Sequence, residues 1–217
     1  MSRLQIQDLN GATKDVKGVY ADALPVASIG GQYLDWLRKG YIFTGFTATP
    51  LSILKYDSAT NVPSLWNPAD SGRLVVPITL SLGPSAAGTE VIHSIGLNYK
   101  VNCGSALGTA APISAYTEVA AVPNLLGSEK KSMAKWSPAT NTLTAVGTLF
   151  MLTGLGMWLE GTPASEAWQD LNFEFNAKLA LKPGTAIQVV STPAASSTTY
   201  SVALTWAEIP YDPELWA

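Results

Sequence analysis

Residues 173–210, FEFNAKLALKPGTAIQVVSTPAASSTTYSVALTWAEIP, carry the clearest structural pattern in the chain. From Phe173 to Leu181 apolar and polar side chains alternate, which is typical of a half-buried β-strand. After the breaker Lys182-Pro183-Gly184 comes a short strand at 187–190, and then a second alternating run. The inward side chains of that run are Tyr200, Val202, Leu204 and Trp206. Three strands joined by turns predict an antiparallel meander with one solvated face.

Strand signals also dominate the rest of the chain from residue 41 onwards. Residues 41–47 and 51–56 predict a hairpin around Ala48-Thr49-Pro50, and residues 73–82 predict a strand in which Pro77 requires an edge position or a bulge. Residues 91–101 alternate as well, with His93 among the apolar positions. No sustained helical periodicity is present. The pattern predicts an all-β protein, a jelly-roll-like β-sandwich.

Residues 1–40 differ from the rest, because they lack a long alternating run and contain the breakers Pro25 and Gly30-Gly31. A short helix at 32–38 would place Tyr33, Trp36 and Leu37 on one side. So few apolar residues do not offset the ordering entropy of such a long segment. We therefore expect an extended N-terminal arm at 1–40 and the β-sandwich domain at 41–217.

The composition argues against nucleic acid and membrane partners. Only 13% of the 217 residues are charged, about half of the usual share, and the net charge is −3. Phosphate binding needs clustered basic residues, and Glu129-Lys130-Lys131, the one short run, is interpreted as an exposed turn. The uncharged stretch 141–159 is interrupted by glycines and threonines, which favours β-strands over a membrane span. The N-terminus lacks the apolar core of a signal peptide, so synthesis in a cytoplasm is expected.

The chain offers little for catalysis. Cys103 is the single cysteine and is interpreted as a small buried residue, and His93, the single histidine, as a packed core or interface residue. No phosphate loop, dinucleotide fingerprint, zinc motif or nucleophile elbow occurs. We expect no enzyme, no cofactor and no metal, although a pair of carboxylates brought together by the fold stays open as an alternative.

The sequence contains 7 tryptophans, which suggest either core packing or flat faces for stacking on sugar rings. Trp206 lies within an alternating strand and is predicted to be core. Trp136 and Trp168 lie in loop-like segments and are the better candidates for an exposed platform.

Several short phrases resemble a group of tailed-bacteriophage virion proteins. The phrase LWNPADSGRLVV at 65–76 is similar to an "NP..SG..L.V" phrase of that group. Downstream, Leu181-Lys182-Pro183-Gly184 and the ending VALTWAEIP at 202–210 are similar to its "PG" and "W.E.P" phrases. The resemblance covers most of residues 41–210 and implies a jelly-roll head decoration, or cement, protein.

That resemblance implies a function on the outer surface of the phage head. The protein would bind the major capsid protein, associate with itself, commonly as a trimer, and stabilise the lattice mechanically. The alternative is a receptor- or glycan-binding module of a phage fibre or tail. The large apolar residues expected at capsid or subunit contacts are Tyr20, Tyr33, Trp36, Leu37, Trp136, Trp168 and Trp216.

Overall fold

Strand β15 (Thr199–Pro210) lies in the middle of one of two large sheets. On one side it pairs with β6 (Arg73–Ala86) and on the other with β3 (Ile42–Phe46) and β4 (Leu51–Ser52). Its inward side chains are buried in the core, as the alternation predicts, and they are Tyr200, Val202, Leu204 and Trp206.

The structure is a computed structural model. The residues that it describes are 5–7, 13–15, 33–47, 49–52, 62–86, 93–106, 113–138, 141–143, 148–157, 171–191 and 199–214. They fall into two compact units, Met1–Asp35 and Trp36–Ala217. The first contains a two-stranded hairpin of β1 (Gln5–Gln7) and β2 (Thr13–Asp15), which the sequence did not predict. The predicted short helix is present as α1 (Leu34–Arg38).

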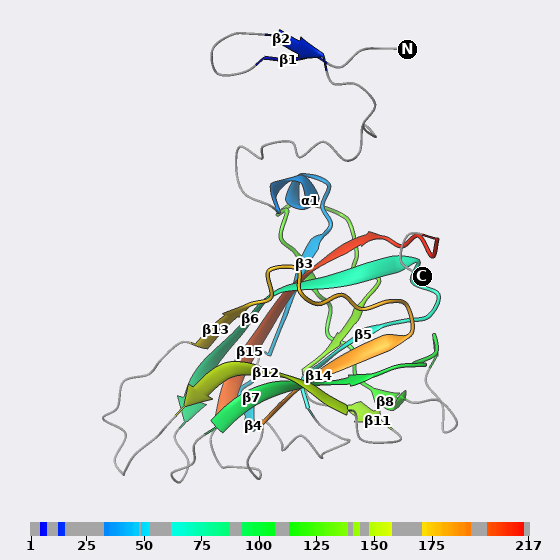
Figure 1. Cartoon of the computed structure of the whole chain (residues 1–217). Helices are drawn as coiled ribbons and strands as arrows, with labels where there is room; N and C mark the ends of the chain where they lie inside the picture. The colour runs from blue at the N-terminus through cyan, green and yellow to red at the C-terminus, as the bar shows by residue number, and fades with distance from the viewer. Residues whose placement is uncertain are drawn as a thin grey trace. The chain divides into compact units, whose positions relative to one another are not determined.

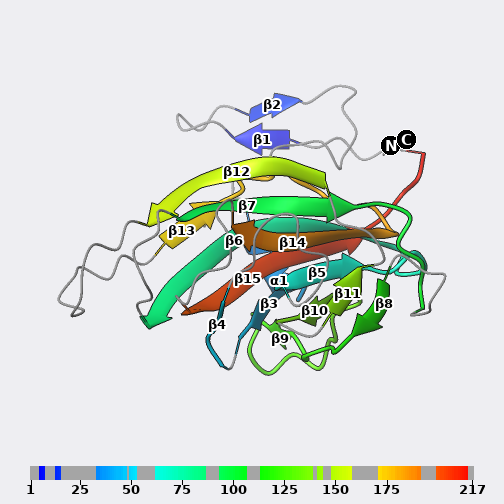
Figure 2. The ribbon, with the colours of Figure 1, turned by 90° about the horizontal axis from the view of Figure 1, so that it is seen from below.

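The second unit is a β-sandwich of two antiparallel sheets, whose layers can be followed in Figures 1 and 2. The six-stranded sheet has the order β13 (Leu171–Glu174), β6, β15, β3 and β9 (Val122–Pro123), with β4 beside β15. The five-stranded sheet has the order β10 (Lys135–Ser137), β5 (Ser64–Asn67), β14 (Thr185–Ser191), β7 (His93–Lys100) and β12 (Thr148–Met157).

The strand pairing is that of a jelly roll. β3 pairs with β15, β5 with β14, β6 with β13 and β7 with β12, so partners lie progressively closer in sequence. β15 also pairs with β6, and β14 with β7, which joins these pairs into the two sheets. A long antiparallel ribbon folded over itself produces this connectivity. The predicted all-β, jelly-roll-like sandwich is therefore confirmed.

The predicted meander at 173–210 is wrong. β13 and β15 lie in the six-stranded sheet with β6 between them, and β14 lies in the other sheet. The alternation at 173–181 ends early as a strand, because Asn176 and Ala177 adopt positive φ angles of 49° and 56° and turn the chain after β13. Leu181 then bridges to Val75.

The predicted hairpin at 41–56 is also wrong. β3 and β4 do not pair with each other; both run antiparallel to successive parts of β15. The amide of Thr47 donates to the carbonyl of Val202 at 2.9 Å, and the amide of Val202 donates to Thr47 Oγ1 at 2.8 Å. The edge therefore continues past Phe46 instead of reversing.

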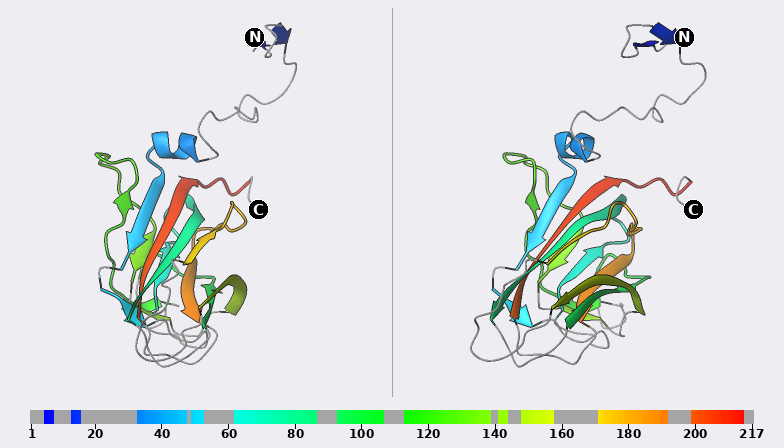
Figure 3. Two further views of the ribbon diagram at one scale, coloured as in Figure 1. Left: turned by 90° about the vertical axis from the view of Figure 1, so that its left-hand side faces the viewer. Right: turned by 60° about the vertical axis from the view of Figure 1, so that its left-hand side comes forward.

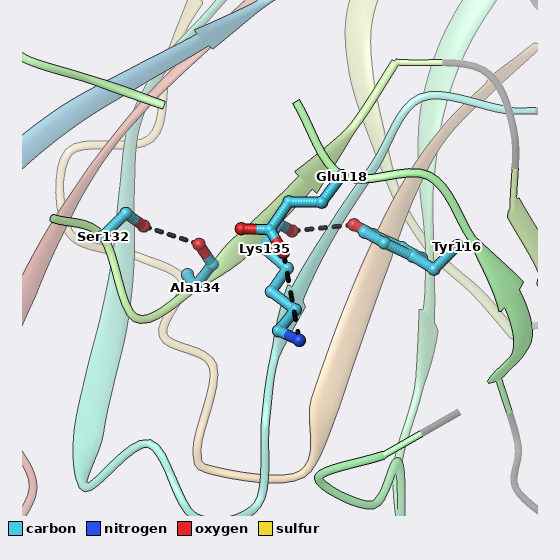
Figure 4. A network of polar contacts seen from close by, with 5 residues as sticks. All are labelled: Tyr116, Glu118, Ser132, Ala134 and Lys135. Atoms are coloured by element: carbon cyan, nitrogen blue, oxygen red, sulfur yellow. Dashed lines mark hydrogen bonds and ion pairs between the residues drawn. The ribbon is translucent and has the colours of Figure 1, made fainter. Parts of the chain in front are cut away.

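A small sheet of β8 (Ile113–Tyr116) and β11 (Asn141–Leu143) contributes a second apolar cluster next to the five-stranded sheet. In this cluster Tyr116 packs edge-on against Trp66, with ring centroids 5.6 Å apart. Its hydroxyl lies 2.8 Å from the carbonyl oxygen of Ser64 and 2.7 Å from that of Lys135. Figure 4 shows this contact beside the ion pair of Lys135 and Glu118, whose charged atoms are 3.9 Å apart. Ala186 of β14 belongs to the same cluster, and β14 is buried along nearly its whole length.

The described residues of the uncharged stretch 141–159 form the strands β11 and β12, as predicted, with two register shifts between β12 and β7. Its strand β12 is the last strand of the five-stranded sheet, and Phe150 in it is exposed. Within the described residues, no helix has the length and apolar character needed to cross a bilayer.

Candidate functional site: a basic cleft beside an exposed loop

The connection between β9 and β10, residues 124–134 (the 124–134 loop), is held in place from its first residue. The amide of Asn124 donates to the carbonyl of Ile42 at 2.9 Å, which ties the loop to β3. The amide of Ser128 donates to the carbonyl of Leu125 at 3.0 Å, and Gly127 has a φ of +83°. Such a φ favours glycine and closes a tight turn at the loop's outer end.

The buried carboxylate of Glu208 holds the other end of this loop. It accepts hydrogen bonds from the amides of Met133 (2.8 Å) and Ala134 (3.1 Å) and from Nε1 of Trp206 (2.9 Å). The hydroxyl of Ser132 also lies within bonding distance of it and of the Ala134 carbonyl, the second contact being drawn in Figure 4. A buried carboxylate with this many donors is well compensated, so Glu208 fixes the loop to β15.

Between these attachments the 124–134 loop presents apolar side chains to solvent. Leu126 is 84% exposed, the largest value among the exposed large hydrophobic residues of the described chain. Leu125 and Met133 in the same loop are also exposed, as is Val122 in the preceding strand. A fixed loop that exposes several large apolar residues is typical of an interaction surface. We call Leu125, Leu126 and Met133 the apolar tip.

A cleft of about 200 Å³ lies at the base of this loop. Tyr41, which follows α1, lies at its centre together with Arg73 from the start of β6 and Lys130 from the loop. The ammonium of Lys130 is 4.6 Å, and the guanidinium carbon of Arg73 5.9 Å, from the centroid of the Tyr41 ring. The other lining residues are Gly40, Phe43, Lys131, Met133 and Glu208. We call this the basic cleft.

The cations of the basic cleft have no ion-pair partner among the described residues. The described part of the chain contains one ion pair, Lys135 with Glu118, which lies outside the cleft. Lys130 instead donates to the carbonyl oxygen of Lys39. Cation–π contacts with Tyr41 do not neutralise these charges, and Glu208 is the one carboxylate in the lining against the cations of Arg73, Lys130 and Lys131, so positive charge is in excess. The cleft is therefore suited to an anionic ligand or an acidic protein segment.

A second concave surface lies over the face of the six-stranded sheet that points away from the core. This groove of about 370 Å³ has small side chains along its floor, with Ser81, Ala203 and Asn172 in register on neighbouring strands. Phe46, 46% exposed, lines it in register with Ala203. No charged residue lines the groove.

Three buried groups of the described chain have raised pKa values. Burial raises the pKa of the Cys103 thiol to about 11 and that of Tyr200 to about 12, and it raises the pKa of Tyr116 further. All three therefore keep their protons near neutral pH and are poor nucleophiles. Cys103 is buried, as the sequence predicts. The described residues contain no cluster of three or more side chains that could hold a metal ion. His93 lies in β7, but its side chain falls outside the described residues.

The predicted contact residues are dispersed. Trp136, one of the two candidates for an exposed platform, is instead core: it is 0% exposed, and its Nε1 donates to the carbonyl of Phe46 at 3.2 Å. β10 carries it into the core opposite Gly45, which leaves room for its indole ring. Tyr33, Trp36 and Leu37 are half-buried at α1, and their role in contacts stays a prediction. Tyr20, Trp168 and Trp216 lie outside the described residues.

Sequence reasoning missed the residues of the basic cleft. Lys130 and Lys131 were visible as the one short basic run, and they do lie in an exposed loop, but nothing in their sequence context indicated that Arg73 and Tyr41 lie beside them. The pairing of β15 with both β3 and β6 brings these two residues to the same end of the sheet. Leu126 carried no sequence signal beyond its place between turn residues.

No protein-family model matches the chain, and comparisons with curated proteins and with solved structures also give no match. The phage resemblance stays a prediction that depends on its own short phrases.

Proposed function

We propose that the chain is a structural protein of a tailed-bacteriophage virion, a head decoration or cement protein. In this role it binds the major capsid protein on the outer lattice and associates with itself. The observation that carries the proposal is the apolar tip, in which Leu126 is 84% exposed on a loop fixed at both ends. A decoration protein needs such a preformed anchor, because small contact energies repeat at many identical sites on a shell.

Two of the phrases that resemble phage proteins are hydrogen-bonded to each other in the fold. The side-chain amide of Asn67 donates to the backbone carbonyls of Arg73 (2.8 Å) and Leu181 (2.9 Å). The backbone carbonyl of Asn67 accepts from the backbone amide of Gly184 (2.9 Å). The "NP..SG" and "PG" phrases therefore form two turns bonded to each other at one end of the sandwich. This arrangement supports the resemblance, because two phrases whose turns are bonded to each other are expected to occur together in related proteins.

The jelly-roll topology is a second support, because the fold is common among viral capsid domains. Fold alone does not decide function, and jelly rolls also serve as lectins. The exposed apolar tip and the basic cleft are what support a binding or structural role.

The proposal is tested first by mass spectrometry of purified particles of the source phage, in which peptides of this chain are expected. Next, purified protein is mixed with head shells that lack it and is sedimented with them. Leu126→Asp should reduce co-sedimentation about tenfold or more, since burying a charge at a desolvated anchor is unfavourable. Val101→Asp, at another exposed apolar residue, is the matched control and should bind normally. Failure of the native protein to sediment with shells would contradict the proposal.

The groove beside Phe46 favours a second candidate function, a glycan-binding module of a fibre or tail. An exposed aromatic ring next to the hydroxyls of Ser81 and Ser201 and the amide of Asn172 offers both stacking and hydrogen bonding to a sugar. Under this alternative, Phe46→Ala weakens glycan binding and leaves shell binding unchanged. A glycan array without signal for well-folded protein removes it.

A further inference from the structure

The basic cleft has a counterpart of opposite charge elsewhere on the same chain. After β15, residues 211–214 read Tyr-Asp-Pro-Glu and expose the carboxylates of Asp212 and Glu214. The amide of Glu214 donates to Oδ1 of Asp212 at 2.9 Å, so a local turn holds both acids near each other. Neither acid forms an ion pair within the described residues. We call residues 211–214 the acidic segment.

The acidic segment does not fill the cleft of its own chain. The amide of Tyr211 donates to the carbonyl of Gly72 at 3.1 Å, and Gly72 directly precedes Arg73, the first residue of β6. Despite this proximity, Asp212 and Glu214 form no ion pair with Arg73. In both views of Figure 3 the chain after β15 leads away from the connection between β9 and β10. The acidic segment therefore begins beside Arg73, yet none of residues 211–214 lines the basic cleft.

We propose that the acidic segment of one copy docks in the basic cleft of a second copy. Asp212 and Glu214 then face Arg73, Lys130 and Lys131, and Tyr41 supplies an aromatic wall. The inference rests on the self-association that the proposed function includes and gives it a contact surface.

Such an interface joins two different patches, so it is heterologous and repeats from copy to copy. If the rotation between copies closes, a ring such as a trimer forms. The charges determine which surfaces meet. Exposed ion pairs contribute little singly, but charge reversal replaces each attraction with a repulsion.

The test is sedimentation velocity of the full chain at low and high salt. The native protein is expected to self-associate at low salt, and this association should weaken at high salt, because salt screens exposed charges. K130E/K131E and D212K/E214K should each weaken association about tenfold or more. The combined variant carries both reversals, has the native net charge and should restore association. That recovery distinguishes a specific contact from a folding defect.

K178E/K182E is the matched control, because it reverses two exposed lysines outside the cleft and should associate as the native protein does. Near-ultraviolet circular dichroism confirms that each variant is folded. The inference is overturned if the native protein stays monomeric, if the reversals leave association unchanged, or if the combined variant does not recover it. Shell co-sedimentation of the same variants is measured separately, so binding to shells by a protein without this self-contact would leave the proposed function standing.

Discussion

Among the described glycines compared, Gly45 leaves the least room for an added side chain. A Cβ at this position would lie 2.5 Å from Cγ of Trp136 and 2.8 Å from Cδ1 and Cδ2. The indole ring has little freedom to move, because it is fully buried and its Nε1 donates to the carbonyl of Phe46. Glycine in β3 is therefore a requirement of close packing.

Gly45→Ala should lower the free energy of unfolding by about 1 to 3 kcal/mol, the usual effect of overpacking a filled core. Urea unfolding followed by tryptophan fluorescence measures the change. The control is Gly83→Ala in β6, where an added Cβ meets nothing within 4 Å. Its stability should stay the same or rise slightly. Equal destabilisation of the two variants would show that the contact with Trp136 is not responsible.

Cys103 gives the stability a dependence on alkaline pH. Its pKa rises from 9.0 to about 11 on folding, chiefly because burial disfavours the thiolate. As pH increases from 9 to 11, the unfolded chain releases this proton while the folded chain retains it. Stability present below pH 9 is therefore lost across this range.

Cys103→Ala removes this contribution, so the variant should lose about 1 to 3 kcal/mol less than the native protein between these two pH values. Parallel urea titrations at both pH values measure the difference. All other ionisable groups are the same in both proteins, so their contributions cancel in the comparison. Identical losses would mean that the thiol ionises equally in the folded and unfolded chains.

The turn after β13 contains a residue that is poorly suited to its backbone conformation. Ala177 has a φ of 56°, in the left-handed region, where a Cβ is unfavourable. Ala177→Gly should therefore raise the free energy of unfolding by about 0.5 to 1 kcal/mol, after allowance for the extra freedom of glycine in the unfolded chain. The measurement is the urea midpoint. Ala180→Gly, at an exposed neighbour without a positive φ, should be neutral or destabilising, and an equal gain there would contradict the explanation.

The same turn shows why local alternation overestimated β13. Residues 173–181 continue the apolar pattern, but side-chain period alone does not report that Asn176 and Ala177 reverse the backbone. Pro77 was more informative, because proline has no backbone N–H and cannot donate to a neighbouring strand. A register shift opposite Pro77 provides the predicted bulge and changes the core-facing positions of β6 from Val75 to Leu80 and Leu82.

The candidate site was less predictable than the strands. The exposed turn at Lys130-Lys131 followed from its charge, but the cleft depends on β3 and β6 reaching β15 from distant parts of the sequence. Aromatic content was misleading for Trp136, since its loop-like surroundings concealed a short strand, β10. Local patterns therefore identified strands, whereas long-range pairing decided which residues meet.

At the scale of the whole molecule, the central strands of the sheets pair on both sides, whereas the edge strands pair on one side. β14 pairs with β5 on one side and β7 on the other and is buried along nearly its whole length. β12 pairs with β7, its register shifts twice, and it is the last strand of its sheet. Local opening requires the loss of one paired strand at β12 but of two at β14.

Native-state hydrogen exchange should reproduce this difference. Amides of β14 should exchange only through global unfolding, about 100-fold or more slowly than those of β12, which can open locally. Peptides from β15, in the middle of the other sheet, serve as an internal control and should match β14. Exchange is followed by mass spectrometry at several urea concentrations, where the β14 rate should follow the global unfolding free energy and the β12 rate should depend less on urea. Equal protection of β12 and β14 would mean that an additional contact covers the edge, and the self-association variants would then show whether a second copy provides it.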